Sequence, residues 1–401
     1  MTVACDVEIL RTFFKTWDGR STKRFEDYIP GLRAGYAHDI WGMLQNFHPQ
    51  KCTESVVSAT LGNLTLEKIP ESVTTRQAAE THPHVQAAIA SLSLLDLILG
   101  LCPSEPTLAE NARPLVLASL DGIMAWIHFC FDFRLAYRVA SHEDTFSFGV
   151  YAQIPFKISV SDPSDDCGPF SMLNHTKSYL HLLIRLWTTP GFQEGRCRDD
   201  TLYIDWVMPD MCPALYLLMA VFQSCCGDGS VFVEEVMSHD LGRRFAEATC
   251  TRAIQVANAA IDSQCPEGIY GYAAKLLKFV QSIYLYKDNR LRQYFDDGRF
   301  MITFTRMFNQ LSRHFPDQGQ LSNKLAEPIV NLYVHTMYSR SPDPCPHRVV
   351  VGNFKGLLAG GYLEMHVLED NAHVDSISTR NTPISNIHFI PTYLHYLHYL
   401  P

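Results

Sequence analysis

Apolar residues recur at spacings of three and four along most of the chain, and proline and glycine interrupt this pattern. The spacing matches one face of an α-helix, whereas turn residues mark the places where helices end. The pattern therefore predicts a succession of roughly ten to thirteen amphipathic helices joined by short breaks.

In the first part of the chain, Pro30 is expected to open a helix whose apolar stripe passes through Tyr36. Pro83 opens a later helix, since the missing proline N–H costs nothing in a first helical turn. Thr107 and Glu110 have the spacing of a capping box for the helix that follows. That helix is apolar almost all round in its second half, so we expect it to lie between other helices.

Helices are expected to resume after residue 170. Their expected ranges are 170–188, 211–226, 241–261, 270–286, 300–315, 325–338 and 349–368.

The pattern changes between residues 141 and 169. Ile154, Phe156 and Ile158 alternate with other residues, which is the period of a strand and predicts two short strands or an extended loop. The polar run 161–168 is expected to be an exposed loop, and a short strand-like segment follows at residues 202–207.

The sequence thus predicts a mainly α fold with two possible architectures. One is an armadillo/HEAT-like α-solenoid of stacked antiparallel helix pairs, and the other is an irregular all-α domain. Successive pairs recur at roughly 40 residues, the size of such repeat units, but no consensus occupies fixed positions. The expected organisation is an N-terminal helical region (1–140), an irregular or extended segment (141–169), a second helical region (170–370) and a poorly structured tail (371–401).

The composition favours a folded protein and argues against two classes of function. Of the 401 residues 47% are hydrophobic and 19% are charged, which excludes wholesale disorder. The net charge is −9 and no basic cluster occurs, so we expect no nucleic-acid partner. Asp96 and Asp121 interrupt long apolar stretches, and a charge is costly in lipid, so we expect no membrane span.

The cysteines indicate a reducing compartment. Twelve cysteines are too few for a disulfide scaffold, and residues 1–20 lack the basic flank and apolar core of a secretory signal. We therefore expect an intracellular protein, cytoplasmic or nuclear, whose thiols are reduced and mostly buried in helices as small hydrophobic groups.

No motif predicts a chemical site. The chain has neither Cys-x-x-Cys nor His-Glu-x-x-His, which are common zinc-binding spacings. The glycine-rich segment 227–229 lacks the lysine of a phosphate-binding loop. Ser238, His239 and Asp240 are residue types of a catalytic triad, but consecutive side chains point in different directions, and a helix cap at Ser238 or Asp240 is the simpler explanation. We therefore predict no catalytic, cofactor-binding or metal-ligating residue and no cofactor.

Two segments near the end of the chain carry a family resemblance. The junction Tyr338-Ser-Arg-Ser-Pro-Asp-Pro-Cys-Pro-His347 and the segment 349–361, together with the late helical run, resemble the long helical regions of fungal proteins that also carry a MYND-type zinc finger. The resemblance implies an armadillo/HEAT-like helical region over most of the chain. The finger needs paired cysteines that this chain lacks, so the resemblance implies neither zinc binding nor finger-mediated recruitment.

These features predict a non-catalytic helical scaffold for protein–protein interaction, with a protein partner that the sequence does not identify. The alternative is an enzyme whose site is assembled from dispersed residues of an all-helical fold. A scaffold should present an extended groove, whereas an enzyme should gather His, Asp or Glu side chains with perturbed pKa values.

Overall fold

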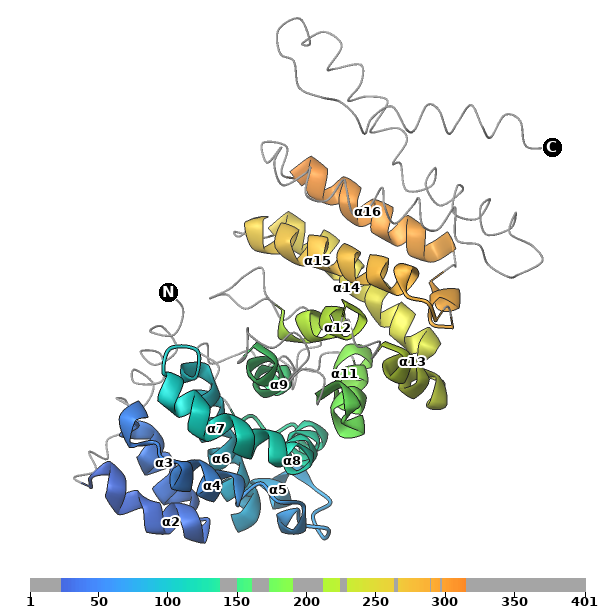
Figure 1. The fold of residues 1–401 in the computed structure, drawn as a ribbon. Helices are drawn as coiled ribbons and strands as arrows, with labels where there is room; N and C mark the ends of the chain where they lie inside the picture. Colours follow the sequence, from blue (N-terminus) through green and yellow to red (C-terminus); the bar gives the residue numbers. More distant parts are fainter. Residues whose placement is uncertain are drawn as a thin grey trace, which may run out of the picture.

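A computed structural model describes residues 23–137, 150–160, 173–189, 212–223, 229–262, 266–288, 290–295 and 298–314 of the chain. Within these ranges every regular element is a helix, which confirms the mainly α fold (Figure 1). The α-helices are α2 (Ile29–Ala34), α3 (Ala37–Gln45), α4 (Glu54–Leu61), α5 (Arg76–Thr81), α6 (Pro83–Leu101), α7 (Pro106–Ala118), α8 (Leu120–Phe133), α9 (Val150–Val160), α11 (Lys177–Thr188), α12 (Pro213–Gln223), α13 (Gly229–Ser238), α14 (Gly242–Asp262), α15 (Pro266–Leu285) and α16 (Gly298–His314). Four short 3₁₀ helices accompany them: η1 (Phe25–Tyr28), η2 (Pro49–Lys51), η3 (Leu66–Lys68) and η4 (Arg292–Tyr294).

The first expected helix is two helices, α2 and α3. Gly35 ends α2 with φ of 74°, a left-handed conformation that glycine adopts without steric cost. Its neighbour Tyr36 donates its backbone N–H to the Gly31 carbonyl at 2.8 Å, which completes the turn. The prediction of one continuous stripe through Tyr36 is therefore wrong, and the side chain of Tyr36 is 63% exposed.

Proline opens α6 at Pro83, as predicted, and it also opens α7, α12 and α15. The capping box at Thr107 is wrong, because α7 already begins at Pro106 and Glu105 is its N-cap.

The expected strands around Ile154 are also wrong, because residues 150–160 form α9. This helix lies between α6 and α12, and its residues from Val150 to Phe156 are all buried. A helix buried on nearly all sides carries apolar side chains around most of its circumference, so the alternation that resembled a strand has no structural meaning here.

The later helices match their predictions within about four residues at α12, α14, α15 and α16, whereas α11 begins at Lys177, well after the predicted start at residue 170. The expected helices 325–338 and 349–368, the loop 161–168, the strand-like segment 202–207 and the tail 371–401 lie outside the described residues. The domain division stays a prediction, although the helix α9 occupies part of the segment 141–169 that was expected to be irregular or extended.

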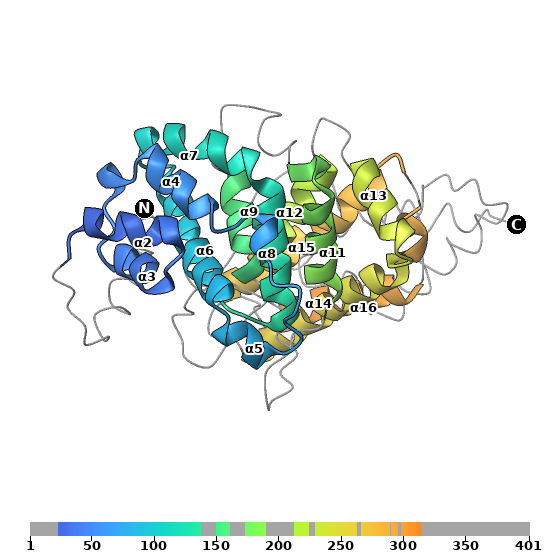
Figure 2. The same ribbon diagram turned by 90° about the horizontal axis from the view of Figure 1, so that it is seen from below.

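The helices follow one another along the long axis of the molecule. α2 and α3 lie at one end and α16 at the other, in both views (Figures 1 and 2). Every extensive contact between described α-helices joins helices whose labels differ by three or less. Two lines of packed helices result, α3–α6–α9–α12–α15 and α8–α11–α14.

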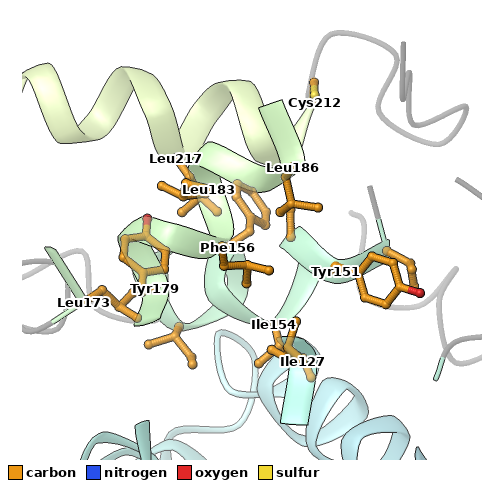
Figure 3. Packing of buried hydrophobic residues seen from close by; sticks show 14 of the residues in the cluster. Ile127, Tyr151, Ile154, Phe156, Leu173, Tyr179, Leu183, Leu186, Cys212 and Leu217 are labelled. Atoms are coloured by element: carbon orange, nitrogen blue, oxygen red, sulfur yellow. The ribbon is translucent and has the colours of Figure 1, made fainter. Parts of the chain in front are cut away.

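The buried residues form one continuous core along this arrangement. Near the middle of the molecule, side chains from α8, α9, α11 and α12 meet, including Ile127, Ile154, Phe156, Leu183, Leu186 and Leu217 (Figure 3). Farther along, five successive helices from α11 to α15 each contribute one aromatic ring to a cluster: Trp187, Phe222, Phe232, Phe245 and Phe279. Neighbouring ring centroids in this cluster lie 5.5 to 6.1 Å apart.

One described helix, α6, is long and apolar enough to cross a membrane, and 72% of its apolar window is buried inside the protein. α7 and α8 pass the same test only together, across a bend of 77°. Asp96 of α6 lies at the interface with α9, where Lys157 Nζ is 2.9 Å from its Oδ1 atom. The absence of a membrane span stays a prediction.

The described cysteines are free thiols, and four of them are buried: Cys52, Cys102, Cys130 and Cys212. Burial raises the pKa of Cys52 to about 12 and that of Cys102 to about 11. These thiols therefore stay protonated at neutral pH and act as small hydrophobic groups, as predicted.

Candidate metal centre

Two imidazoles and one carboxylate meet at the surface between α11 and α13. His181 comes from α11, Glu235 comes from α13, and His239 lies in the turn that directly follows α13. One ligand atom from each of the three residues lies within 4.8 Å of the other two. His181 Nδ1 is 3.7 Å from Glu235 Oε1, and His239 Nε2 is 3.1 Å from the same oxygen.

Helical spacing explains why these side chains share one surface. Glu235 and His239 are four residues apart, so they lie one turn apart on the same side of α13 and of the turn that ends it. On α11, Tyr179 and Leu183 point into the core (Figure 3). His181 lies midway between them in sequence and therefore on the opposite side of the helix.

The cluster is open to solvent on one side. The exposed fraction of the side chain is 36% for His181, 46% for His239 and 18% for Glu235. The rings of His181 and His239 have centroids 5.1 Å apart, on either side of the carboxylate. An incoming ion can thus reach the three donor atoms without any opening of the core.

A third histidine, His128 of α8, supports His181 from the other side, with ring centroids 5.6 Å apart. Arg185 Nη1 lies 3.2 Å from His128 Nδ1, and arginine can only donate, so Nδ1 must accept. The proton of neutral His128 is therefore on Nε2, which donates to the Ser178 carbonyl at 2.8 Å. Both nitrogens of His128 are thus occupied.

Arg185 is itself fixed between α8 and α11. It pairs with Asp132, and its guanidinium carbon lies 4.6 Å from the centroid of the Phe131 ring. This arrangement holds a positive charge beside the histidine cluster.

The surroundings keep His181 neutral. Partial burial lowers the pKa of His181, and the neighbouring His239 and Arg185 lower it further, against the opposing effect of Glu235. Burial also lowers the pKa of His128. A neutral imidazole has a free lone pair, and this is the form that binds a metal ion.

The donor set has a definite chemical preference. Imidazole nitrogen and carboxylate oxygen together suit zinc and similar transition metals, whereas magnesium and calcium prefer oxygen donors throughout. Two histidines and one glutamate with an open fourth position can hold a zinc ion together with a water molecule.

The sequence analysis did not consider this cluster, and its expectation of no metal-ligating residue stays a prediction. His239 had been considered only as part of Ser238-His239-Asp240, where a helix cap was predicted. The Leu241 N–H donates to the Val236 carbonyl at 3.0 Å across Asp240, which is the backbone pattern of a cap at the C-terminal end of α13. Ser238 donates to the Glu235 carbonyl at 2.9 Å at the end of α13, and Asp240 has φ of 52° in the turn before α14. The spacing of Glu235 and His239 was a usable signal, but nothing in the sequence indicated that the distant His181 would join them.

The segment 227–228, the resemblance-bearing residues 338–347 and the glycines of 349–361 lie outside the described residues. Comparison with known proteins finds no matching family model, no similar curated protein and no similar solved structure, so the resemblance to the helical regions of MYND-finger proteins stays a prediction.

Proposed function

We propose that this protein is a non-catalytic helical scaffold, an armadillo-like solenoid that binds a protein partner along its stacked helices. The observation that carries the proposal is the pattern of helix contacts, in which α3, α6, α9, α12 and α15 pack in one line and α8, α11 and α14 in another. Armadillo units contain three helices each, so equivalent helices of successive units would be three apart.

Contacts limited to near neighbours are typical of repeat proteins, which use their length to present an extended surface. Hydrogen bonds between helices follow the same rule. Trp126 Nε1 of α8 donates to the Thr65 carbonyl before η3 at 3.1 Å, and Trp187 Nε1 of α11 donates to Thr249 Oγ1 of α14 at 2.9 Å. These bonds support a stack in which each unit rests on the adjacent one.

The two hollows described among these helices are more typical of a binding surface than of an enclosed active-site pocket. The cavity lined by Leu99, Val116 and Ile158 between α6, α7 and α9 has a volume of about 10 Å³, enough for about one water molecule. The hollow at the start of α3 has a volume of about 420 Å³, is open to solvent, and is lined by Tyr36, His38 and Gln86. Exposed tyrosine is common at protein interfaces, where its ring packs while its hydroxyl stays hydrated.

The test is recovery of a partner by the full chain under cross-linking, followed by gel filtration of the complex. A scaffold should elute with a partner in a fixed ratio, and cross-links should map to the exposed sides of the described helices. Substitutions at exposed apolar positions spaced along the stack then locate the contact: Tyr36→Ala, Ile254→Ala and Leu285→Ala. Elution of the chain alone, with only the proteins that an unrelated helical bait also recovers, would contradict the proposal.

The alternative function, an enzyme with a dispersed site, is favoured by one observation. His181, Glu235 and His239 form the donor set of a catalytic zinc site with room for a water molecule. This alternative requires a bound metal ion, whereas the scaffold does not. A failure to bind metal would therefore remove the enzyme alternative and leave the scaffold proposal standing.

A further inference from the structure

We propose that His181, Glu235 and His239 bind one Zn²⁺ ion and that this ion joins α11 to α13. The inference goes beyond the scaffold proposal, because it assigns a ligand to particular side chains and does not depend on a protein partner.

The geometry is close to that of a formed site. Zinc holds nitrogen and oxygen ligands at about 2.0–2.1 Å, so two ligands of a tetrahedral ion lie roughly 3.3–3.4 Å apart. The distances from Glu235 Oε1 are 3.7 Å to His181 Nδ1 and 3.1 Å to His239 Nε2. The two histidine nitrogens lie within 4.8 Å of each other, so ion binding would draw the three donor atoms closer together, and the open side leaves the fourth position to water.

The charges also fit a divalent cation. Glu235 contributes a carboxylate that offsets part of the ion's charge, and it lies between the two imidazoles, with contacts to both. Arg185 is paired with Asp132, so its own charge is partly compensated.

Neighbouring side chains restrict the movement of the site. Arg185 lies on α11 one turn from His181 and contacts both Phe131 and Asp132 of α8. Outer contacts of this kind orient the ligands of metal sites and contribute to their affinity. A zinc ion bound to His181 would thus connect α13, through α11, to α8.

The experiment is a zinc titration of the full chain after removal of metal, by calorimetry and by competition with a chromophoric chelator. The chain has 17 histidines and 12 cysteines, so the decisive quantity is the difference between variants. Loss of an outer contact costs roughly 10–100-fold in affinity, so His181→Ala, His239→Ala and Glu235→Gln should each weaken the tightest zinc site by more than about 100-fold.

Two matched controls separate ligand loss from general effects. Glu234→Gln changes the exposed neighbour of Glu235 on the same helix, and His84→Ala removes an exposed histidine at the start of α6. Both variants should keep the wild-type zinc affinity within about twofold, because neither side chain belongs to the donor set. Circular dichroism of every variant checks that the helices are intact, and millimolar Mg²⁺ should not displace zinc.

Two further measurements on the wild-type chain do not depend on any variant. X-ray absorption of the zinc-loaded protein should show only nitrogen and oxygen neighbours near 2.0–2.1 Å and no sulfur near 2.3 Å. Hydrogen exchange should slow in both α11 and α13 when zinc binds. Equal zinc affinity in the wild type and all three ligand variants, a sulfur shell, or slowing confined to one helix would overturn the proposal.

Discussion

At the scale of single residues, Gly122 sets how closely α8 approaches the chain before η3. A side chain at this position would place its Cβ atom 2.3 Å from the backbone carbonyl oxygen of Leu64. The same contact surface carries the hydrogen bond from Trp126 Nε1 to the Thr65 carbonyl. The absence of a side chain at residue 122 is therefore a packing requirement.

Gly122→Ala should destabilise the protein by about 1–3 kcal/mol, because a backbone atom cannot move aside as a flexible side chain can. Chemical unfolding monitored by tryptophan fluorescence measures the change. Gly62→Ala is the matched control: Gly62 has helical φ of −61°, and its Cβ atom would lie 3.3 Å from the nearest oxygen. The control should be neutral or slightly stabilising, and an equal loss in both variants would argue against the close contact at Gly122.

Residues whose role depends on local geometry could be predicted from the sequence. Pro83 is one of them, since its ring and missing N–H suit the start of a helix wherever that helix lies. Gly122 and His181 were not predictable in this way. Their importance depends on Leu64 and Glu235, which are distant in sequence and are brought near only by the packing of helices.

At the scale of helices, α6 and α9 are joined by a buried ion pair. Lys157 Nζ lies 2.9 Å from both the Oδ1 atom and the carbonyl oxygen of Asp96. The exposed side-chain fractions are 12% for Lys157 and 6% for Asp96. The two buried charges thus compensate each other.

Lys157→Met should destabilise the protein by about 3–5 kcal/mol, because it leaves the Asp96 carboxylate buried without its cation. The double variant Asp96→Leu, Lys157→Met removes both charges and should be more stable than Lys157→Met alone. Urea unfolding of the wild type, both single variants and the double variant gives the coupling energy. A double variant that loses the sum of the two single losses would show that the pair is not coupled.

Helices with one buried face could be predicted, and α14 and α15 are examples. α9 could not, because burial on all sides leaves no polar face from which to measure a period. The break between α2 and α3 was missed for a different reason: an apolar residue, Tyr36, continues the stripe in sequence although Gly35 reverses the backbone in space.

At the scale of the whole molecule, stability should be local, because the extensive contacts among the described α-helices join helices that are close in chain order. Arg252 of α14 offers a way to test this. Its side chain is buried, its guanidinium carbon lies 3.7 Å from the centroid of the Trp187 ring, and it donates to the carbonyl oxygens of Trp187 at 2.7 Å and Leu186 at 3.3 Å. It therefore caps the end of α11 from α14.

Arg252→Met should leave those carbonyl groups without their donor, at a cost of roughly 1–3 kcal/mol. Hydrogen exchange should speed up in α11 and α14 and in their neighbours α8, α9, α12, α13, α15 and α16, and stay unchanged in α2, α3 and α4. Arg244→Met, at an exposed position of the same helix, should change exchange nowhere. A uniform increase across all described helices would indicate a single cooperative unit.

The helical class and the order of most described helices followed from apolar spacing, but their stacking did not. No repeated consensus occurs in the sequence. The spacing between successive helices of the first line is also uneven, since they begin at Ala37, Pro83, Val150, Pro213 and Pro266. The contacts between packed segments also differ in chemistry. Trp126 donates to the backbone carbonyl of Thr65, whereas Trp187 donates to the side chain of Thr249.

The two lines of helices have a consequence for how such a chain can grow or shrink. Insertion of a single helix would shift every later helix by one place in the order. A helix of the first line would then pack against a surface that normally contacts a helix of a different line. Duplication or loss of three helices at once would return each remaining helix to a partner of its own kind. For the proposed solenoid, viable length variants should therefore differ by whole triplets of helices.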